Sequence, residues 1–198
     1  MPPGPPDNLS MIRRVLGDGY VALALVELGV VERPGDGVTK VNVVVKEGAL
    51  EVAVHSEGVG LVDAVFQALH ARYAPEYQSL SSIALVGFAV STAIESGRGI
   101  RTDATCTVTI DVTNSMGRRF TFQDTSRSMT SSATRAVLAM VEHFVNSERA
   151  FVTLYNARQD AQQRGRVDLV GRFTAELAEV VKSTSYTEVI ERMQRELG

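Results

Sequence analysis

The order strand–strand–strand–helix occurs twice along this chain, and this internal repeat constrains the fold more than any other feature. In the first copy, strand patterns cover residues 20–31, 38–45 and 49–55, and an apolar helical stripe follows at 62–74. In the second, strand patterns cover 83–94 and 104–112 and begin again at 120, and a stripe follows at 131–146. The two stripes superimpose after a shift of 71 positions, which places Val62 on Ala133 and Tyr73 on Phe144.

Within the strands, apolar and polar residues alternate, which indicates sheets with one buried and one wet face. Leu50, Val52 and Val54 alternate with polar or small residues, and residues 104–112 repeat the pattern. Each half has one helix to cover one sheet, so the halves must bury their remaining apolar surface together. We therefore expect an α+β fold in which two pseudo-symmetric βββα units pack together, with a helical C-terminal extension.

These patterns divide the chain into three parts. Residues 1–18 are expected to form a disordered Pro-rich tail and a short helix, because proline disfavours regular structure. Residues 19–148 form the central domain, with repeat one at 20–78 and repeat two at 79–148. Residues 149–198 form the helical extension, which either packs on the domain or docks to a partner. The Pro-rich start and the additional helices favour an independent protein over a fragment.

Composition excludes several classes of function. The net charge is -3 without a run of Lys or Arg, so neither nucleic acid nor a membrane is expected as a partner. The single cysteine, Cys106, excludes a disulfide within the chain. His55, His70 and His143 lie in separate elements, so no metal and no cofactor are expected. No signal peptide and no apolar stretch of about 20 residues is present, which predicts a soluble cytoplasmic protein.

The first helix follows a turn with the sequence Gly58-Val59-Gly60-Leu61-Val62-Asp63-Ala64. Two glycines let a backbone approach a ligand or adopt positive φ, although they also suit an ordinary tight turn. The helix N-terminus offers unpaired N–H groups, which favour a carboxylate. Asp63 could cap the helix or bind an ammonium group.

Set between a hairpin and an amphipathic helix in a duplicated unit, this turn resembles the regulatory domain of α-isopropylmalate synthases and citramalate synthases. In that family the turn reads Gly-x-Gly-Pro-apolar-Asp/Asn-Ala, and the similarity covers residues 20–146. The resemblance implies a non-catalytic homodimer that binds leucine or isoleucine. The ligand-binding residues that it implies are Gly58, Gly60, Leu61, Val62, Asp63 and Ala64 in the turn, with Phe88, Cys106 and Val108 as an apolar wall.

The chain departs from the family pattern in two places. Leu61 replaces the proline, and the equivalent turn of the second repeat, residues 124–132, contains Ser and Thr but no glycine. We expect those hydroxyls to cap the second helix. Two alternatives stay open: a scaffold with a non-functional pocket that docks to a separate synthase catalytic chain, and an unrecognised enzyme, for which no constellation of residues is apparent. Cys106 equally suits a small core residue.

Overall fold

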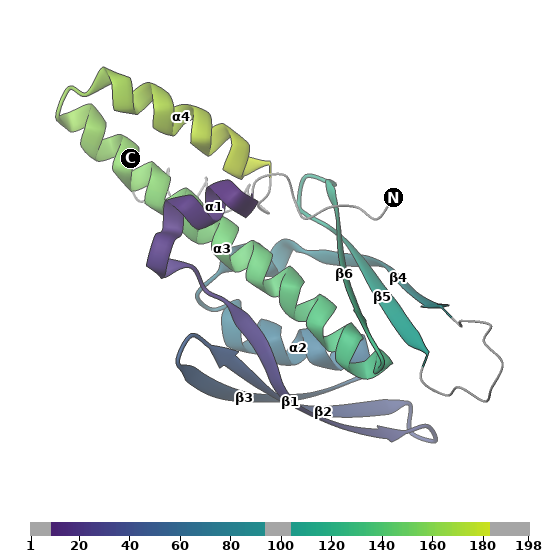
Figure 1. The fold of residues 1–198 in the computed structure, drawn as a ribbon. Coiled ribbons are helices and arrows are strands. Elements are labelled where there is room, and N and C mark those ends of the chain that lie inside the picture. Colours follow the sequence, from purple (N-terminus) through teal and green to yellow (C-terminus); the bar gives the residue numbers. More distant parts are fainter. Residues whose placement is uncertain (1–8, 94–103, 183–198) are drawn as a thin grey trace.

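The computed structural model describes residues 9–93 and 104–182 of the 198-residue chain. The first half comprises α1 (Leu9–Leu16), β1 (Leu23–Arg33), β2 (Val38–Glu47), β3 (Leu50–Gly58) and α2 (Leu61–Tyr73). After a 3₁₀ turn, the second half comprises β4 (Ala84–Ala93), β5 (Thr105–Thr113), β6 (Arg119–Ser126), α3 (Met129–Gln163) and α4 (Val167–Val181). The expected order of two βββα units followed by a helical extension is confirmed (Figure 1).

Each half contains a three-stranded antiparallel sheet, with order β1-β2-β3 in the first sheet and β4-β5-β6 in the second. The register of the first strand is interrupted at the same place in both sheets. The pairing of β1 shifts between Leu25 and Glu27, and the pairing of β4 shifts between Leu85 and Gly87. Because a bulge is a specific local device, its recurrence supports a duplicated unit.

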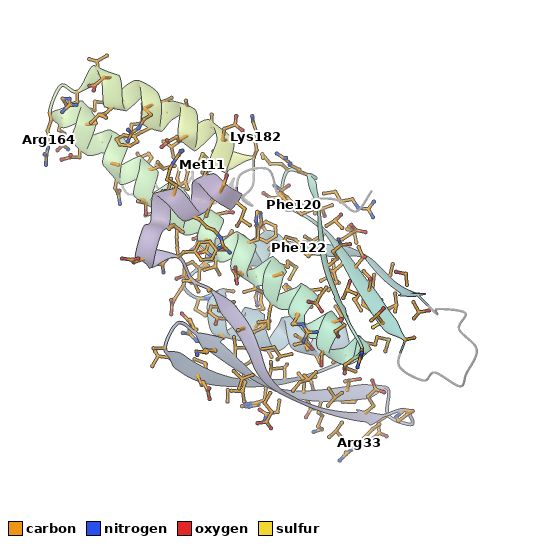
Figure 2. All side chains as sticks on the ribbon, viewed as in Figure 1. Met11, Arg33, Phe120, Phe122, Arg164 and Lys182 are labelled. Atoms are coloured by element: carbon orange, nitrogen blue, oxygen red, sulfur yellow. The ribbon has the colours of Figure 1, made fainter. Side chains whose placement is uncertain are left out.

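α2 and the first part of α3 lie between the two sheets (Figure 1). α2 packs on β2 and β3, α3 packs on β5 and β6, and the helices also contact each other. Their apolar faces and the inner faces of both sheets merge into one buried cluster. Phe120 and Phe122, labelled in Figure 2, join β6 to this core, and the ring of Phe120 lies 5.3 Å from that of Phe144 in an edge-to-face contact.

The structure corrects the alignment of the two repeats by three residues. The N-caps of α2 and α3 are Gly60 and Ser128, which are 68 positions apart rather than 71. Strand pairing agrees, because Gly58 and Ser126 occupy corresponding ends of β3 and β6. With this shift, every buried residue of α2 falls on a buried residue of α3. An apolar stripe repeats at three and four residues, so a helix alone cannot distinguish a shift of one turn.

Beyond the sheets, α3 continues without interruption through residue 148 to Gln163, so repeat two and the extension share one helix of 35 residues. α4 returns along it to form a two-helix arm, whose tip lies near Arg164 in Figure 2. Leu177 and Val180 of α4 pack with Phe151 and Leu154 of α3 and with Ile12 of α1 in a second buried cluster. The described part of the extension therefore packs on its own chain, while residues 1–8 and the last part of the predicted extension, residues 183–198, lie outside the described residues.

Candidate functional site

A cavity of about 660 Å³ lies at the start of α2. Three separate parts of the chain form it: the turn and first two turns of α2, the inner face of β4, and the first turn of α3. Among the lining residues that the structure describes, only Asp63 and Gln67 have polar side chains, and the remainder are apolar or glycine. The described residues that line it are Val59, Gly60, Leu61, Val62, Asp63, Phe66, Gln67, Leu85, Phe88, Met129 and Ala133.

The start of α2 leaves backbone donors open at this cavity. Its N-cap, Gly60, has extended backbone angles and no side chain to cap the helix. The first hydrogen bond of the helix joins the N–H of Ala64 to the carbonyl of Gly60 at 2.9 Å. Among the described residues, the N–H groups of Leu61, Val62 and Asp63 have no acceptor. A ligand carboxylate is the group that such donors suit.

The equivalent end of α3 is closed, as expected from its hydroxyl residues. Ser128 is the N-cap, and its Oγ accepts a hydrogen bond from the N–H of Ser131 at 3.2 Å. Ser126 Oγ in turn lies 2.8 Å from Ser132 Oγ. The capping prediction is confirmed, and it shows that the two repeats differ at the position where a ligand anion would bind.

Asp63 stabilises the turn before α2. Its Oδ2 accepts a hydrogen bond from the N–H of Val59 at 3.0 Å, and its Oδ1 accepts one from Gln67 Nε2 at 3.5 Å. The carboxylate therefore reaches back over the helix start, as a capping residue does. It remains at the cavity wall, where its negative charge can attract an ammonium group.

The expectation of positive φ at the two glycines is wrong. Gly60 has φ of −173° and ψ of 173°, which any residue can adopt, and Gly58 is not among the glycines with positive φ. Gly58 is required for another reason: a Cβ there would lie 2.5 Å from Asp63 Oδ2 and 2.7 Å from the N atom of Ala64. A Cβ on Gly60 would meet no atom within 4 Å, so this residue faces open space at the cavity.

Five of the nine residues expected at the ligand site line this cavity: Gly60, Leu61, Val62, Asp63 and Phe88. Phe88 reaches it from β4, and half of its surface is exposed. Gly58 and Ala64 lie behind the turn and support it without lining the cavity. Cys106 and Val108 are also absent from the lining, because they face inward on β5 and are buried in the second sheet.

Sequence reasoning missed six lining residues. Phe66 lies in the first helical stripe and Leu85 in the fourth strand pattern. The sequence revealed both patterns, but it did not assign either residue to the site. Met129 precedes the second stripe, and although Ala133 lies in that stripe, nothing in the sequence linked it to this site, because only tertiary packing brings the start of α3 to the start of α2. Val59 and Gln67 complete the set.

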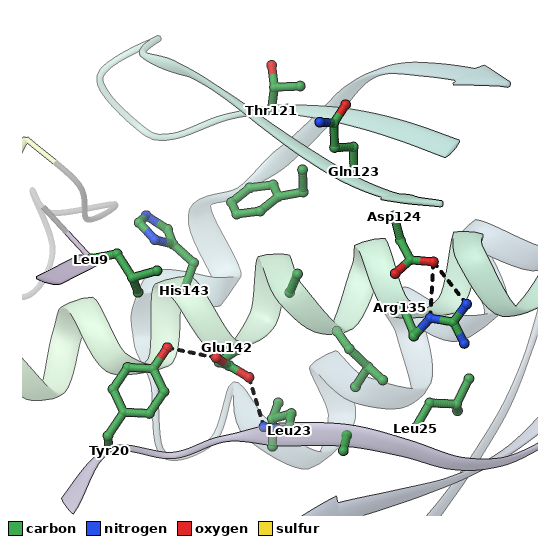
Figure 3. Close-up of a pocket in the computed structure, with 14 residues that line it drawn as sticks. Leu9, Tyr20, Leu23, Leu25, Thr121, Gln123, Asp124, Arg135, Glu142 and His143 are labelled. Atoms are coloured by element: carbon green, nitrogen blue, oxygen red, sulfur yellow. Dashed lines mark hydrogen bonds and ion pairs between the residues drawn. The ribbon is translucent and has the colours of Figure 1, made fainter. Parts of the chain in front are cut away.

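A second cavity, of about 620 Å³, lies between β1, β6 and the middle of α3 (Figure 3). Two lining positions correspond through the repeat: Gln67 and Leu85 border the first cavity, and their equivalents Arg135 and Leu25 border the second. Here, however, Arg135 forms an ion pair with Asp124 at 3.0 Å. These two charges therefore satisfy each other within the chain.

The other end of this second cavity is also closed by internal contacts. Glu142 accepts hydrogen bonds from Tyr20 Oη at 2.7 Å and from the N–H of Leu23 at 2.8 Å, as Figure 3 shows. Burial, followed by the hydrogen bond to Glu142, raises the pKa of Tyr20 to about 12. These contacts join β1 to α3, which gives the second cavity a structural role.

Neither a cluster of metal-ligating side chains nor a similarity to known proteins indicates a function. Among the described residues, no three His, Cys, Asp or Glu side chains gather as a set that could hold a metal ion. Within residues 9–93 and 104–182, no helix combines the length and the apolar character needed to cross a membrane. No protein-family model matches the chain, and no curated protein matches it in sequence.

Proposed function

We propose that this protein is a non-catalytic regulatory module that binds a branched-chain amino acid, leucine or isoleucine, in the cavity at the start of α2. The observation that carries the proposal is that distant segments of the chain meet at one cavity. Phe88 and the turn around Gly60 are distant in sequence, yet they line the same apolar cavity beside open helix donors. This combination agrees with the feedback-inhibition domain of α-isopropylmalate synthases that the turn resembles.

The polar end of the cavity suits a zwitterion better than a simple anion. The N–H groups of Leu61 and Val62 can bind a carboxylate, with support from the positive end of the helix dipole. None of the described residues that line the cavity is Lys or Arg, so a bare anion would lack a counter-charge among them. An α-ammonium group, in contrast, can approach the carboxylate of Asp63.

The other end of the cavity suits an aliphatic side chain. Phe66, Leu85, Phe88 and Met129 surround it, and apolar groups make up nearly all of the remaining wall. Transfer of a branched side chain from water to such a wall contributes about 1.5–3 kcal/mol when burial is complete. Among the described lining residues there is no nucleophile and no acid–base pair, since Asp63 is the only ionisable one.

Titration calorimetry with L-leucine, L-isoleucine and L-valine tests this proposal. We expect heat of binding from leucine or isoleucine, and none from Gly60→Val, because the added side chain enters the cavity without a clash in the fold. Gly171→Val is the matched control, since Gly171 also faces open space but lies on α4, far from the cavity. It should bind like the parent.

A second variant examines the helix donors. Gly60→Ser supplies the hydroxyl cap that α3 already has at Ser128, so it should occupy one of the open N–H groups and weaken binding while leaving the fold intact. The absence of any heat of binding with all three amino acids would refute the proposal. Binding that survives both substitutions at Gly60 would place the ligand elsewhere.

The alternative is a scaffold that docks to a separate synthase catalytic chain and binds no amino acid. The open apolar surface of Phe88 and Val90, which are 51 % and 40 % exposed, favours this function specifically. The two functions separate cleanly by experiment. A scaffold predicts no heat with any amino acid, together with binding to the catalytic chain that Phe88→Asp abolishes.

A further inference from the structure

The two repeats differ in charge beside the starts of α2 and α3. In the second repeat, Arg135 of α3 forms an ion pair with Asp124 of β6 at 3.0 Å, as Figure 3 shows. The shift of 68 positions places Gln67 of α2 and Ser56 of β3 at the equivalent positions of the first repeat. Both of these residues are neutral, so the first repeat does not form this ion pair.

The first repeat has an isolated carboxylate instead. Asp63 lies one helical turn before Gln67, and it pairs with no Lys or Arg in the part of the chain that the structure describes. Its equivalent at the start of α3 is Ser131, which is neutral. Asp63 is partly buried at the cavity wall, where a charge without a counter-charge is unfavourable. A cationic group of a ligand would supply that counter-charge.

The contacts of Asp63 orient its carboxylate without neutralising it. Its Oδ2 accepts the hydrogen bond from the N–H of Val59 at 3.0 Å, which commits this oxygen to the turn. Its Oδ1 accepts a hydrogen bond from Gln67 Nε2 at 3.5 Å, at the long end of the range for such bonds. Both donors are uncharged, and a carboxylate oxygen can accept more than one hydrogen bond. Oδ1 therefore has capacity for an ammonium group.

We propose that Gln67 determines the specificity of the cavity for α-amino acids over carboxylic acids of the same shape, because its neutral side chain leaves the charge of Asp63 available to an α-ammonium group. This inference rests on the proposed function, since it concerns the ligand of the same cavity. Gln67→Arg would place a guanidinium group four residues after Asp63, the spacing at which opposite charges pair along a helix. The chain would then supply the counter-charge itself, as it does at Arg135.

Titration calorimetry with L-leucine and with 4-methylpentanoate, which is leucine without its α-ammonium group, tests this specificity. We expect the parent to bind leucine about tenfold more tightly than 4-methylpentanoate, and Gln67→Arg to bind the two with a ratio of about one. Gln67→Met has a neutral side chain of similar length and should keep the ratio of the parent. Gln162→Arg is the matched control, since Gln162 is exposed near the far end of α3, and it should also keep that ratio.

The ratio of the two affinities distinguishes failure of this inference from failure of the proposed function. Equal binding of both compounds by the parent would overturn the inference, and so would an unchanged ratio in Gln67→Arg, although leucine binding itself would stand in both cases. Loss of the preference in Gln67→Met would also overturn it, because the amide group and not the missing charge would then be responsible. A parent that binds neither compound would overturn the proposed function and this inference together. Since Gln67 is exposed on α2, these substitutions leave the core intact, and unchanged circular dichroism spectra check this.

Discussion

At the scale of single residues, the two glycines of the turn before α2 have different roles. Gly58 lies against the first turn of the helix, where a methyl group would overlap Asp63 and the backbone of Ala64. Gly60 borders the cavity with free space around it. One glycine therefore permits close packing, and the other leaves a helix end open to a ligand.

This difference predicts opposite responses to the same substitution. Gly58→Ala should lower the free energy of unfolding by about 1–3 kcal/mol, the usual cost of overpacking, because the backbone of Ala64, 2.7 Å from the added Cβ, cannot turn away even if the Asp63 side chain does. Gly60→Ala should change it by less than about 0.5 kcal/mol. Urea denaturation of both variants measures the difference, and equal stability of the two would contradict the assigned roles.

The raised pKa of Tyr20 predicts that the free energy of unfolding decreases at alkaline pH. Its pKa is about 12 in the folded protein, above the value near 10 expected in the unfolded chain, so the unfolded state ionises first. The contribution of this group is fully present below pH 10 and is lost as the pH rises toward 12. The decline in the urea midpoint over that range should be smaller in Tyr20→Phe than in the parent. Parallel profiles for the two proteins would show that Tyr20 is not responsible.

At the scale of elements, most of the fold could be predicted from the sequence. The alternation in residues 104–112 identified β5 within one residue of its observed ends, Thr105 and Thr113. The length of α3 was harder to predict, since its apolar face changes partner from the second sheet to α4 near Ala150. The site was only half predictable, because proximity of Met129 to Gly60 depends on tertiary packing.

The Ser128 cap allows a prediction about how the N-terminus of α3 contributes to the stability of the protein. Ser128→Ala removes the acceptor of the Ser131 N–H and should lower the free energy of unfolding by about 1 kcal/mol. Ser128→Gly should cost only a few tenths, because water reaches the freed N–H more easily. Chemical denaturation resolves the two variants. A stabilised Ser128→Ala protein would mean that another group caps the helix.

At the scale of the whole molecule, two buried clusters divide the structure into a central domain and an arm. A cut at the boundary predicted from the sequence, between residues 148 and 149, would divide α3 in the middle of a buried stretch. A cut after residue 164 respects the structure, because it removes α4 and leaves α3 complete. The first cluster contains no residue of α4, so the central domain should not depend on it.

Deletion of residues 165–198 should therefore leave a folded central domain with a destabilised arm, because Phe151 and Leu154 lose their cover. Circular dichroism should show retained sheet and a lower melting temperature. Complete unfolding of the truncated chain would mean that the two clusters are one cooperative unit.

Single substitutions on α4 assess the same packing without a deletion. Leu177→Ala should cost about 2 kcal/mol, since this side chain is nearly buried in the arm. Val167→Ala, on the same helix but 80 % exposed, should change the free energy of unfolding by less than about 0.5 kcal/mol. Equal effects of the two substitutions would contradict the packing of α4 on α3.

The unbroken course of α3 has a mechanical consequence. Its first residue, Met129, borders the cavity, and its last turn reaches Gln163 at the tip of the arm, so a rod about 50 Å long joins the two. If the rod tilted by about 5° around its cavity end, the far end would move by about 4 Å. A small change of side-chain packing at Met129 would then become a displacement of several ångströms at the tip of the arm, which is large enough to alter a contact with another protein.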